Sequence, residues 1–410
     1  MTRGDTVPLT ALVGQLLPAL DAAFPTDLLD VLAHFLQDHA AAEDVDLLLV
    51  DYELDLLVRV RRDEPSTSSQ ELPVDSSDAG RAYSTQATIA VADGTRALVY
   101  MPVSLRAERL GVLRVRFPGE VPRATVDGLR QVATVVAYVV LAAGRFTDMY
   151  EQARRRKPLA LDAEMQWNLL PVRAFAGPQF EVAGQLMPAY EVGGDSFDYS
   201  VESDALHVSV TDAVGHGIGA SLLDALTVSA LRNGRRAGVN LDEQVQRAHL
   251  AVHNQFNPPR PTSARSTSWP LSTMWFVTAL VARLDLASGE VSAVNAGHPN
   301  PFLIRTGKVT PVVMSPQAPL GMFPSTRYVE QRFTLQPRDR LFFLSDGVTD
   351  AAAKGREPFG ETRLQDVLLS TADQPPHEAV RHILGTVSQY QQGNLRDDAT
   401  ALCLDWHGVH

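Results

Sequence analysis

The chain has 410 residues, of which 45% are hydrophobic and 20% are charged. These proportions allow an ordinary buried core, and the length suggests two or three domains. The 36 basic and 48 acidic residues give a net charge of −12 at pH 7. Such an acidic chain repels phosphate backbones and anionic lipids, so we expect neither nucleic-acid nor membrane binding. Cys403 is the single cysteine, which excludes an intramolecular disulfide or a zinc cluster and predicts a cytoplasmic protein.

The first 145 residues predict a small α+β domain, residues 1–145. Apolar residues at helical spacing begin at Leu28, and a long helix is expected from Thr125 to about Arg145. Its apolar stretch, Val132 to Ala143, is shorter than the roughly 20 residues that span a bilayer. The stripe fits a core helix or a dimer seam equally well. Residues 63–80 are expected to form an exposed loop, and strands are predicted at 46–50, 54–60, 87–92, 97–103 and 111–117.

Residues 146–172 differ in character and are interpreted as a helical linker. A basic run, Arg154 to Lys157, precedes Pro158, which ends any helix there. A second amphipathic segment runs from Leu159 to Leu170. Four cations on so acidic a chain are typical of a solvated helix end rather than a nucleic-acid patch.

Residues 173–410 predict a second domain that is rich in strands. Strands cluster with strands and helices come in pairs, which favours a layered α+β sandwich over alternating parallel units. A Pro-, Ser- and Arg-rich loop is expected over residues 257–270. The strands are expected at 180–188, 195–201, 206–211, 275–286, 291–296, 302–304, 328–335, 340–345 and 400–404, and the helices at 218–233, 241–256, 361–369 and 377–391.

Aspartates in this second domain share a local pattern, because each lies at a predicted strand end beside glycine or another aspartate. They are Asp195, Asp212, Asp346 and the pair Asp397–Asp398. A carboxylate that ends a buried strand is poorly solvated unless a cation compensates it. Several such carboxylates without a histidine or cysteine cluster favour Mg²⁺ or Mn²⁺. The alternative for any one of them is a turn-capping role.

Two glycine-flanked features are less specific. The stretch Gly215 to Ala220 imitates a dinucleotide-binding loop, but no second strand with an acidic end follows at the required distance. Glycines there also allow a backbone to approach a phosphate closely. His216 and His298 are more typical of structural turn residues than of ligands.

The motifs in their order resemble the metal-dependent (PPM) serine/threonine phosphatases of the bacterial SpoIIE/RsbU type. The resemblance covers about residues 159–404 and implies an α-β-β-α sandwich with two Mn²⁺ or Mg²⁺ ions between the sheets. The motifs are Gln166–Pro171, Val192-Gly193-Gly194-Asp195, Asp212–Gly217, Phe276–Ala279, Asn295–Pro299, Ser345–Asp350, Phe359-Gly360 and Asp397–Thr400.

The same resemblance assigns roles to individual residues. Asp212 would bridge both metals and Ala213 would contribute its backbone carbonyl. Asp346 and Asp397 would complete the shell of the first metal, and Asp195 would lie on the side of the second. Asp212 and Asp346 are the expected catalytic residues, whereas Asp198 and Asp398 are expected outside the innermost ligands. Ala213-Val214 stands where Val-Ser is frequent in the family, and the 257–270 loop is longer than expected, but every metal ligand is present.

We therefore expect an active phosphatase that hydrolyses phosphoserine or phosphothreonine on a regulatory protein of the anti-sigma-factor-antagonist type. A catalytically silent phosphatase fold that only binds a partner is the alternative. The first domain more loosely resembles a GAF sensor module, through its element order and the phrase Leu110–Val115. That resemblance implies an unidentified sensor ligand and homodimerisation through the linker helix.

Overall fold

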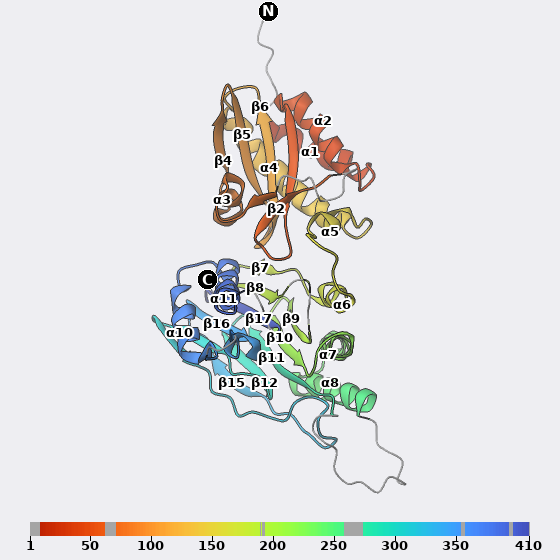
Figure 1. The fold of residues 1–410 in the computed structure, drawn as a ribbon, viewed down its shortest axis with the longest axis vertical. Coiled ribbons are helices and arrows are strands. Elements are labelled where there is room, and N and C mark those ends of the chain that lie inside the picture. Colours follow the sequence, from red (N-terminus) through yellow and green to blue (C-terminus); the bar gives the residue numbers. More distant parts are fainter. Residues whose placement is uncertain are drawn as a thin grey trace, which may run out of the picture. The chain divides into compact units, whose positions relative to one another are not determined.

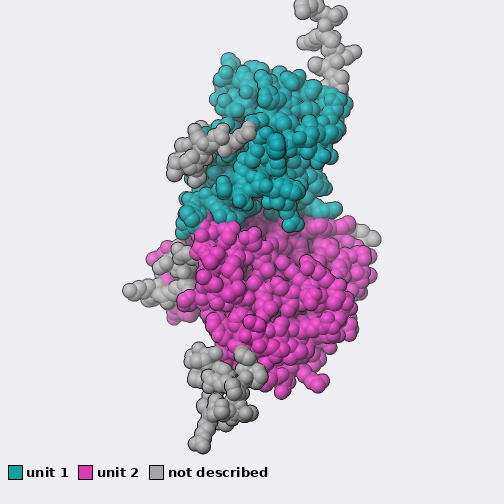
Figure 2. All heavy atoms as spheres, turned by 90° about the vertical axis from the view of Figure 1, so that its right-hand side faces the viewer, with its two compact units in different colours: residues 1–158 teal, residues 159–410 magenta. Residues whose placement is uncertain are grey.

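The computed structural model describes residues 9–61, 71–188, 190, 193–257, 274–353, 357–392 and 397–409. Val192 and nearly all of the predicted 257–270 loop lie outside this set, as does part of the predicted 63–80 loop. The chain forms two compact units, residues 1–158 and 159–410, which are coloured separately in Figure 2. The segment 146–172 contributes one short helix to each unit: α5 (Met149–Ala153) to the first and α6 (Leu161–Leu169) to the second.

Unit 1 is built on a six-stranded antiparallel sheet with the strand order β3-β2-β1-β6-β5-β4 (Figure 1). The strands are β1 (Asp44–Val50), β2 (Leu56–Arg59), β3 (Glu71–Pro73), β4 (Ile89–Asp93), β5 (Arg96–Leu105) and β6 (Glu108–Phe117). The other helices are α1 (Leu9–Asp21), α2 (Leu28–Ala40), α3 (Asp78–Thr85) and α4 (Arg123–Ala143). Helices α1 and α3 and strand β3 were not predicted from the sequence; β3 lies within the predicted 63–80 loop, and α3 begins near its end.

The two faces of this sheet are both buried. Along β1, Leu47 and Leu49 point to the core formed with α1, α2 and α4, whereas Leu48 and Val50 point to the core formed with α3. This alternation follows from the period of two residues in a strand. Helix α4 places Val132, Val136 and Val140 in the first core, so this face of its apolar stripe is a core face. Among the described helices, α4 alone is long and apolar enough to cross a membrane by length and composition, and 44% of its apolar window is buried.

Unit 2 contains two antiparallel sheets with the orders β15-β12-β11-β10-β9 and β14-β13-β16-β17-β8-β7. The strands are β7 (Ala174–Ala176), β8 (Phe180–Met187), β9 (Asp195–Val201), β10 (Ala205–Ala213), β11 (Val277–Asp285), β12 (Glu290–Ala296), β13 (Phe302–Arg305), β14 (Lys308–Pro311), β15 (Gln331–Thr334), β16 (Asp339–Leu344) and β17 (Ala399–Trp406). The helices besides α6 are α7 (Ile218–Arg236), α8 (Leu241–Phe256), α9 (Asp346–Thr349), α10 (Gly360–Ser370) and α11 (Pro376–Tyr390).

The sheets pack face to face around one apolar core, with large contributions from Phe180, Phe197, Phe343 and Trp406. Helices α7 and α8 cover the outer face of the five-stranded sheet, and α11 packs on β8 and β17 of the other sheet (Figure 1). The layers therefore follow the order helix, sheet, sheet, helix. The expected α-β-β-α sandwich is confirmed for this unit.

Candidate metal centre

The apolar stripes between the two sheets end in carboxylates. On β10, Leu206, Val208 and Val210 face the opposite sheet, and Asp212 is the next residue of that stripe. On β9, Asp195 occupies the same position relative to Phe197 and Tyr199. Because alternate residues of a strand share a face, the core pattern itself directs these carboxylates into the space between the sheets.

Asp195 and Asp212 lie opposite each other at the end of the β9–β10 ladder. The Asp195 side chain is 3% exposed, and its Oδ2 atom has no hydrogen-bond partner. Burial, followed by the charges of Asp212 and Asp398, raises the pKa of Asp195 well above its ordinary value. Burial and the charges of Asp346 and Asp397 raise the pKa of Asp212 to about 7. These two carboxyls thus sit in a region of excess negative charge.

The other sheet contributes the remaining carboxylates. Asp346 is the first residue of α9, directly after β16, and burial and the charge of Asp397 raise its pKa. Asp397 lies exposed just before β17, next to the buried Asp398. Gly347 allows α9 to pack closely against the backbone of Asp398, because a Cβ atom at position 347 would lie 1.7 Å from the Asp398 carbonyl oxygen. The α9 turn and the Asp397–Asp398 segment are therefore packed backbone to backbone.

Asp398 holds the loop that leads into β9. Its Oδ2 atom accepts hydrogen bonds from the backbone N–H groups of Gly193 and Asp195, the latter at 3.3 Å. Burial nevertheless raises the pKa of Asp398 to about 7. Gly194 is required next to it, because a Cβ atom at this position would lie 2.3 Å from the Ala213 carbonyl oxygen. Asp398 thus positions the backbone around Asp195.

Thr278 and His298 support Asp212 from β11 and the turn after β12. Thr278 lies opposite Asp212 in the β10–β11 ladder, and its hydroxyl hydrogen bond to the carboxylate opposes the rise in the pKa of Asp212. The same hydroxyl is 2.9 Å from Nδ1 of His298, whose pKa burial lowers to about 3. This contact of Thr278 was not predicted from the sequence, although Thr278 belongs to the Phe276–Ala279 motif.

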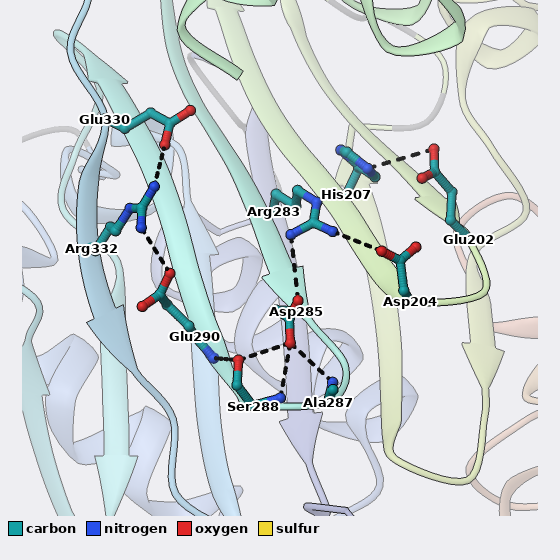
Figure 3. Close-up of polar contacts among 10 residues, drawn as sticks. All are labelled: Glu202, Asp204, His207, Arg283, Asp285, Ala287, Ser288, Glu290, Glu330 and Arg332. Atoms are coloured by element: carbon teal, nitrogen blue, oxygen red, sulfur yellow. Dashed lines mark hydrogen bonds and ion pairs between the residues drawn. The ribbon is translucent and has the colours of Figure 1, made fainter. Parts of the chain in front are cut away.

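The opposite end of the same sheet has a different charge pattern. There, Arg283 pairs with Asp204 and Asp285, and Arg332 pairs with Glu290 and Glu330 (Figure 3). Within the described ranges, none of the carboxylates Asp195, Asp212, Asp346, Asp397 and Asp398 forms an ion pair with a basic side chain. The carboxylates at one end of the sheet thus have arginine partners, whereas those at the other end have none among the described residues.

Asp198 does not belong to this cluster. It lies on the helix-facing side of β9 and forms ion pairs with Arg232 at 2.8 Å and Arg235 at 3.2 Å, both on α7. Its charge is therefore already compensated, and its role is to fasten α7 to β9. His216 is exposed in the loop before α7. The glycine-rich stretch serves as this strand-to-helix loop, with φ values of 96° at Gly215 and 73° at Gly217.

The donor set suits a hard divalent cation. It consists of carboxylates with raised pKa values, one of which has an unpartnered buried oxygen, and of the Ala213 carbonyl at the end of β10. In the described part of the chain, no three His, Cys, Asp or Glu side chains are grouped as they stand to hold one ion. Ion binding would therefore require the carboxylates of the two sheets to turn toward a common point.

The two-sheet sandwich with carboxylates at the strand ends defines the class of PP2C-type (PPM) phosphatase domains. The family model described as Stage II sporulation protein E (SpoIIE) matches residues 202–407. The chain belongs to the SpoIIE family. This confirms the resemblance that the ordered motifs indicate; the resemblance of unit 1 to a GAF module stays a prediction.

Three relatives show the range of similarity. Protein IcfG from Synechocystis sp. is 25% identical over 252 residues, which cover 57% of this chain and 40% of IcfG. The phosphoserine phosphatase RsbP from Bacillus subtilis is 20% identical, with 59% of this chain and 56% of RsbP covered. The phosphoserine phosphatase RsbU from the same organism is 19% identical, with 62% and 71% covered. The chain thus spans about half the length of IcfG and RsbP.

Proposed function

We propose that this protein is a metal-dependent phosphatase that hydrolyses phosphoserine and phosphothreonine on a regulatory protein. One observation carries the proposal: the two sheets place Asp195, Asp212, Asp346 and Asp397 near one another with no basic partner among the described residues, and neighbouring negative charge and burial raise the pKa values of Asp195, Asp212 and Asp346. Structural carboxylates of the same unit, such as Asp198 and Asp285, do have such partners. The described residues therefore leave the negative charge of this cluster uncompensated, which suits a bound cation.

The proposed ligands of two Mn²⁺ or Mg²⁺ ions are Asp195, Asp212, Asp346, Asp397 and the Ala213 carbonyl. Two such metal ions, when bound, would lower the pKa of water and offset the negative charge of a phosphoryl group. The residues of the chain supply placement: Thr278 orients Asp212, and Asp398 fixes the backbone beside Asp195. Asp346 lies at the exposed edge of the cluster, where a phosphorylated side chain can approach.

The test is Mn²⁺-dependent hydrolysis of p-nitrophenyl phosphate. Asp212→Ala and Asp346→Ala should each abolish turnover while the protein stays folded by circular dichroism. Asp204→Ala is the matched control, because this exposed carboxylate lies at the opposite end of the same sheet and pairs with Arg283. Full activity in either cluster variant contradicts the proposed centre. Lack of turnover by the unaltered protein with every divalent ion would favour the catalytically silent alternative.

We further propose a phosphoserine regulatory protein of the anti-sigma-factor-antagonist type as the substrate, in the cytoplasm. The similarity to RsbP and RsbU, both named phosphoserine phosphatases, supports the phosphoserine class. The proposal predicts hydrolysis of phosphoserine and phosphothreonine peptides in preference to a phosphotyrosine peptide of the same sequence. Equal turnover of all three peptides would contradict it.

Unit 1 is proposed to act as a GAF-like sensor. A cavity of about 540 Å³ lies between α2 and the β1–β2 pair, with Asp30, Asp46, Arg59 and Met149 among its lining residues, and is a candidate place for the ligand. Met149 begins α5, so a ligand there would contact the last helix of the unit. Differential scanning fluorimetry against a metabolite library, with Ala33→Trp to fill the cavity, tests this site.

Helix α5 is held firmly by the rest of unit 1. Tyr150 donates a hydrogen bond to the Pro25 carbonyl at 2.9 Å, and Arg154 donates to the Val50 carbonyl at 3.0 Å. The Tyr52 hydroxyl bonds to Glu151. We propose that these contacts transmit the state of unit 1 and that homodimerisation involves the exposed ring of Tyr138 on α4. Light scattering of the full chain and of Tyr138→Glu tests the dimer; a monomeric parent protein would contradict it.

A further inference from the structure

A fully buried carboxyl on α7 is not used by the proposed reaction. Asp224 is 0% exposed, and its Oδ1 atom accepts hydrogen bonds from Thr211 at 2.6 Å and from Ser196 at 3.1 Å. The two hydroxyls also lie 2.8 Å from each other. Its Oδ2 atom has no hydrogen-bond partner. A buried carboxyl with one unsatisfied oxygen is costly, so its presence in a core helix requires a reason.

The two hydroxyls belong to the neighbours of two proposed metal ligands. Ser196 follows Asp195 on β9, and Thr211 precedes Asp212 on β10. Ser196 and Thr211 form the rung of the ladder next to the Asp195–Asp212 rung. Because successive side chains alternate between faces, the hydroxyls point to α7 while the carboxylates point between the sheets. Asp224 therefore contacts β9 and β10 on the face of the sheet that packs against α7, through the residues adjacent to Asp195 and Asp212.

Helix α7 also fixes the loop that follows Asp212. Asp212 and Asp224 are separated by the glycine-rich loop and the first two turns of α7, so the contact of Asp224 with Thr211 fixes both ends of that loop. Ser221, one turn before, donates a hydrogen bond to the Gly193 carbonyl at 3.2 Å. The same helix thus touches the backbone before Asp195 and the strand before Asp212.

We propose that Asp224 is a positioning residue that holds the ends of β9 and β10 in register, so that Asp195 and Asp212 face the same ion. This inference rests on the proposed function. Asp224 acts through Ser196 and Thr211 and touches neither the ions nor the phosphoryl group. Loss of the contact should leave the ligands present but less well aligned, which weakens ion binding more than it slows turnover at saturating metal.

The experiment compares two pairs of variants of the full chain. Thr211→Val removes a hydroxyl that bonds to Asp224, whereas Thr227→Val removes an equally buried hydroxyl that bonds only within α7, to the Leu223 carbonyl at 2.9 Å. Asp224→Leu removes the acceptor, whereas Asp224→Asn keeps an acceptor oxygen for both hydroxyls. For each variant, MnCl₂ binding is followed by electron paramagnetic resonance of free Mn²⁺, hydrolysis of p-nitrophenyl phosphate gives kcat at saturating metal, and urea unfolding in EDTA gives stability.

Substitution of residues that orient metal ligands typically weakens binding by about 10- to 100-fold, and we expect this range for Thr211→Val and Asp224→Leu. Asp224→Asn should retain most of the Mn²⁺ affinity of the unaltered protein. Thr227→Val should retain the Mn²⁺ affinity but lose about as much stability as Thr211→Val. Unchanged Mn²⁺ affinity in Thr211→Val and Asp224→Leu overturns this inference alone. If the unaltered protein binds no Mn²⁺, the proposed function fails first and the inference falls with it.

Discussion

Asp195 and Asp212 are direct cross-strand neighbours in the β9–β10 ladder. Like charges in this arrangement destabilise a sheet, and here burial adds to the cost, as the raised pKa values of both residues show. The fold nevertheless keeps both carboxylates. We therefore expect these two carboxylates to lower the stability of the metal-free fold although the proposed activity requires them.

The first prediction concerns this opposition. Asp212→Asn should make the metal-free protein more stable at pH 8, on the order of 1–3 kcal/mol, because a carboxyl with a pKa of about 7 no longer has to ionise in a partly buried site. The same change should abolish Mn²⁺-dependent turnover. Urea unfolding in EDTA and p-nitrophenyl phosphate hydrolysis measure the two effects. With Asp204→Asn as the exposed control, a destabilised Asp212→Asn would contradict the charge argument.

The second prediction concerns metal removal. Mn²⁺ that binds only the folded chain should raise the unfolding free energy by about 2.7 kcal/mol at 100 times its Kd. EDTA should reverse this gain, and Asp346→Ala should show a much smaller one. The melting temperature, measured by thermal unfolding at fixed protein concentration with and without MnCl₂, reports this stabilisation. A melting temperature that does not respond to Mn²⁺ in the unaltered protein would count against the centre.

The third prediction is the pH dependence contributed by Asp224. Burial raises its pKa from 3.8 to about 7 in the folded chain, so the folded state keeps a proton that the unfolded state releases. The stability associated with that proton is complete below about pH 4 and is lost as the pH rises toward 7. Asp224→Asn should therefore exceed the unaltered protein in stability at pH 8, by on the order of a few kcal/mol, and this advantage should shrink toward pH 5.

Comparison of the two proteins at each pH removes contributions that they share. One of these is His298, whose lowered pKa has the opposite sign and costs stability as the pH falls below 6.5. Urea unfolding in EDTA at pH 5, 6, 7 and 8 gives the difference. An advantage of Asp224→Asn that is the same at all four values would show that ionisation of Asp224 does not affect folding.

The fourth prediction tests the backbone contact between α9 and the Asp398 segment. Gly347→Ala should cost several kcal/mol or prevent folding, on the order of 3 kcal/mol at least, because its Cβ atom would meet the Asp398 carbonyl oxygen at 1.7 Å. Gly385→Ala on α11 is the matched control, since nothing lies within 4 Å of a Cβ atom there. That control should gain about 0.5–1 kcal/mol from helix propensity. Equal effects of the two substitutions would contradict the packing described for α9.

The sequence by itself predicted most of the strands and singled out the aspartates at their ends. The core alternation of β9 and β10 can be recognised locally, because a period of two residues leaves its mark on Leu206, Val208 and Val210. The ordered motifs around Asp195, Asp212, Asp346 and Asp397 indicated the family that the comparisons confirm. Short or weakly patterned elements such as α3, β3, β7 and β14 were missed, because tertiary contacts rather than local periodicity stabilise them.

Only the tertiary structure decided which aspartates have partners. Asp198 resembles Asp195 in the sequence, yet it faces α7 and pairs with Arg232 and Arg235, because it lies an odd number of residues away along the same strand. Asp224 has no motif, and its bonds to Ser196 and Thr211 exist only because α7 packs across both strands. Local patterns fix the face on which a side chain lies, whereas its charge partner comes from whichever distant element folds against that face.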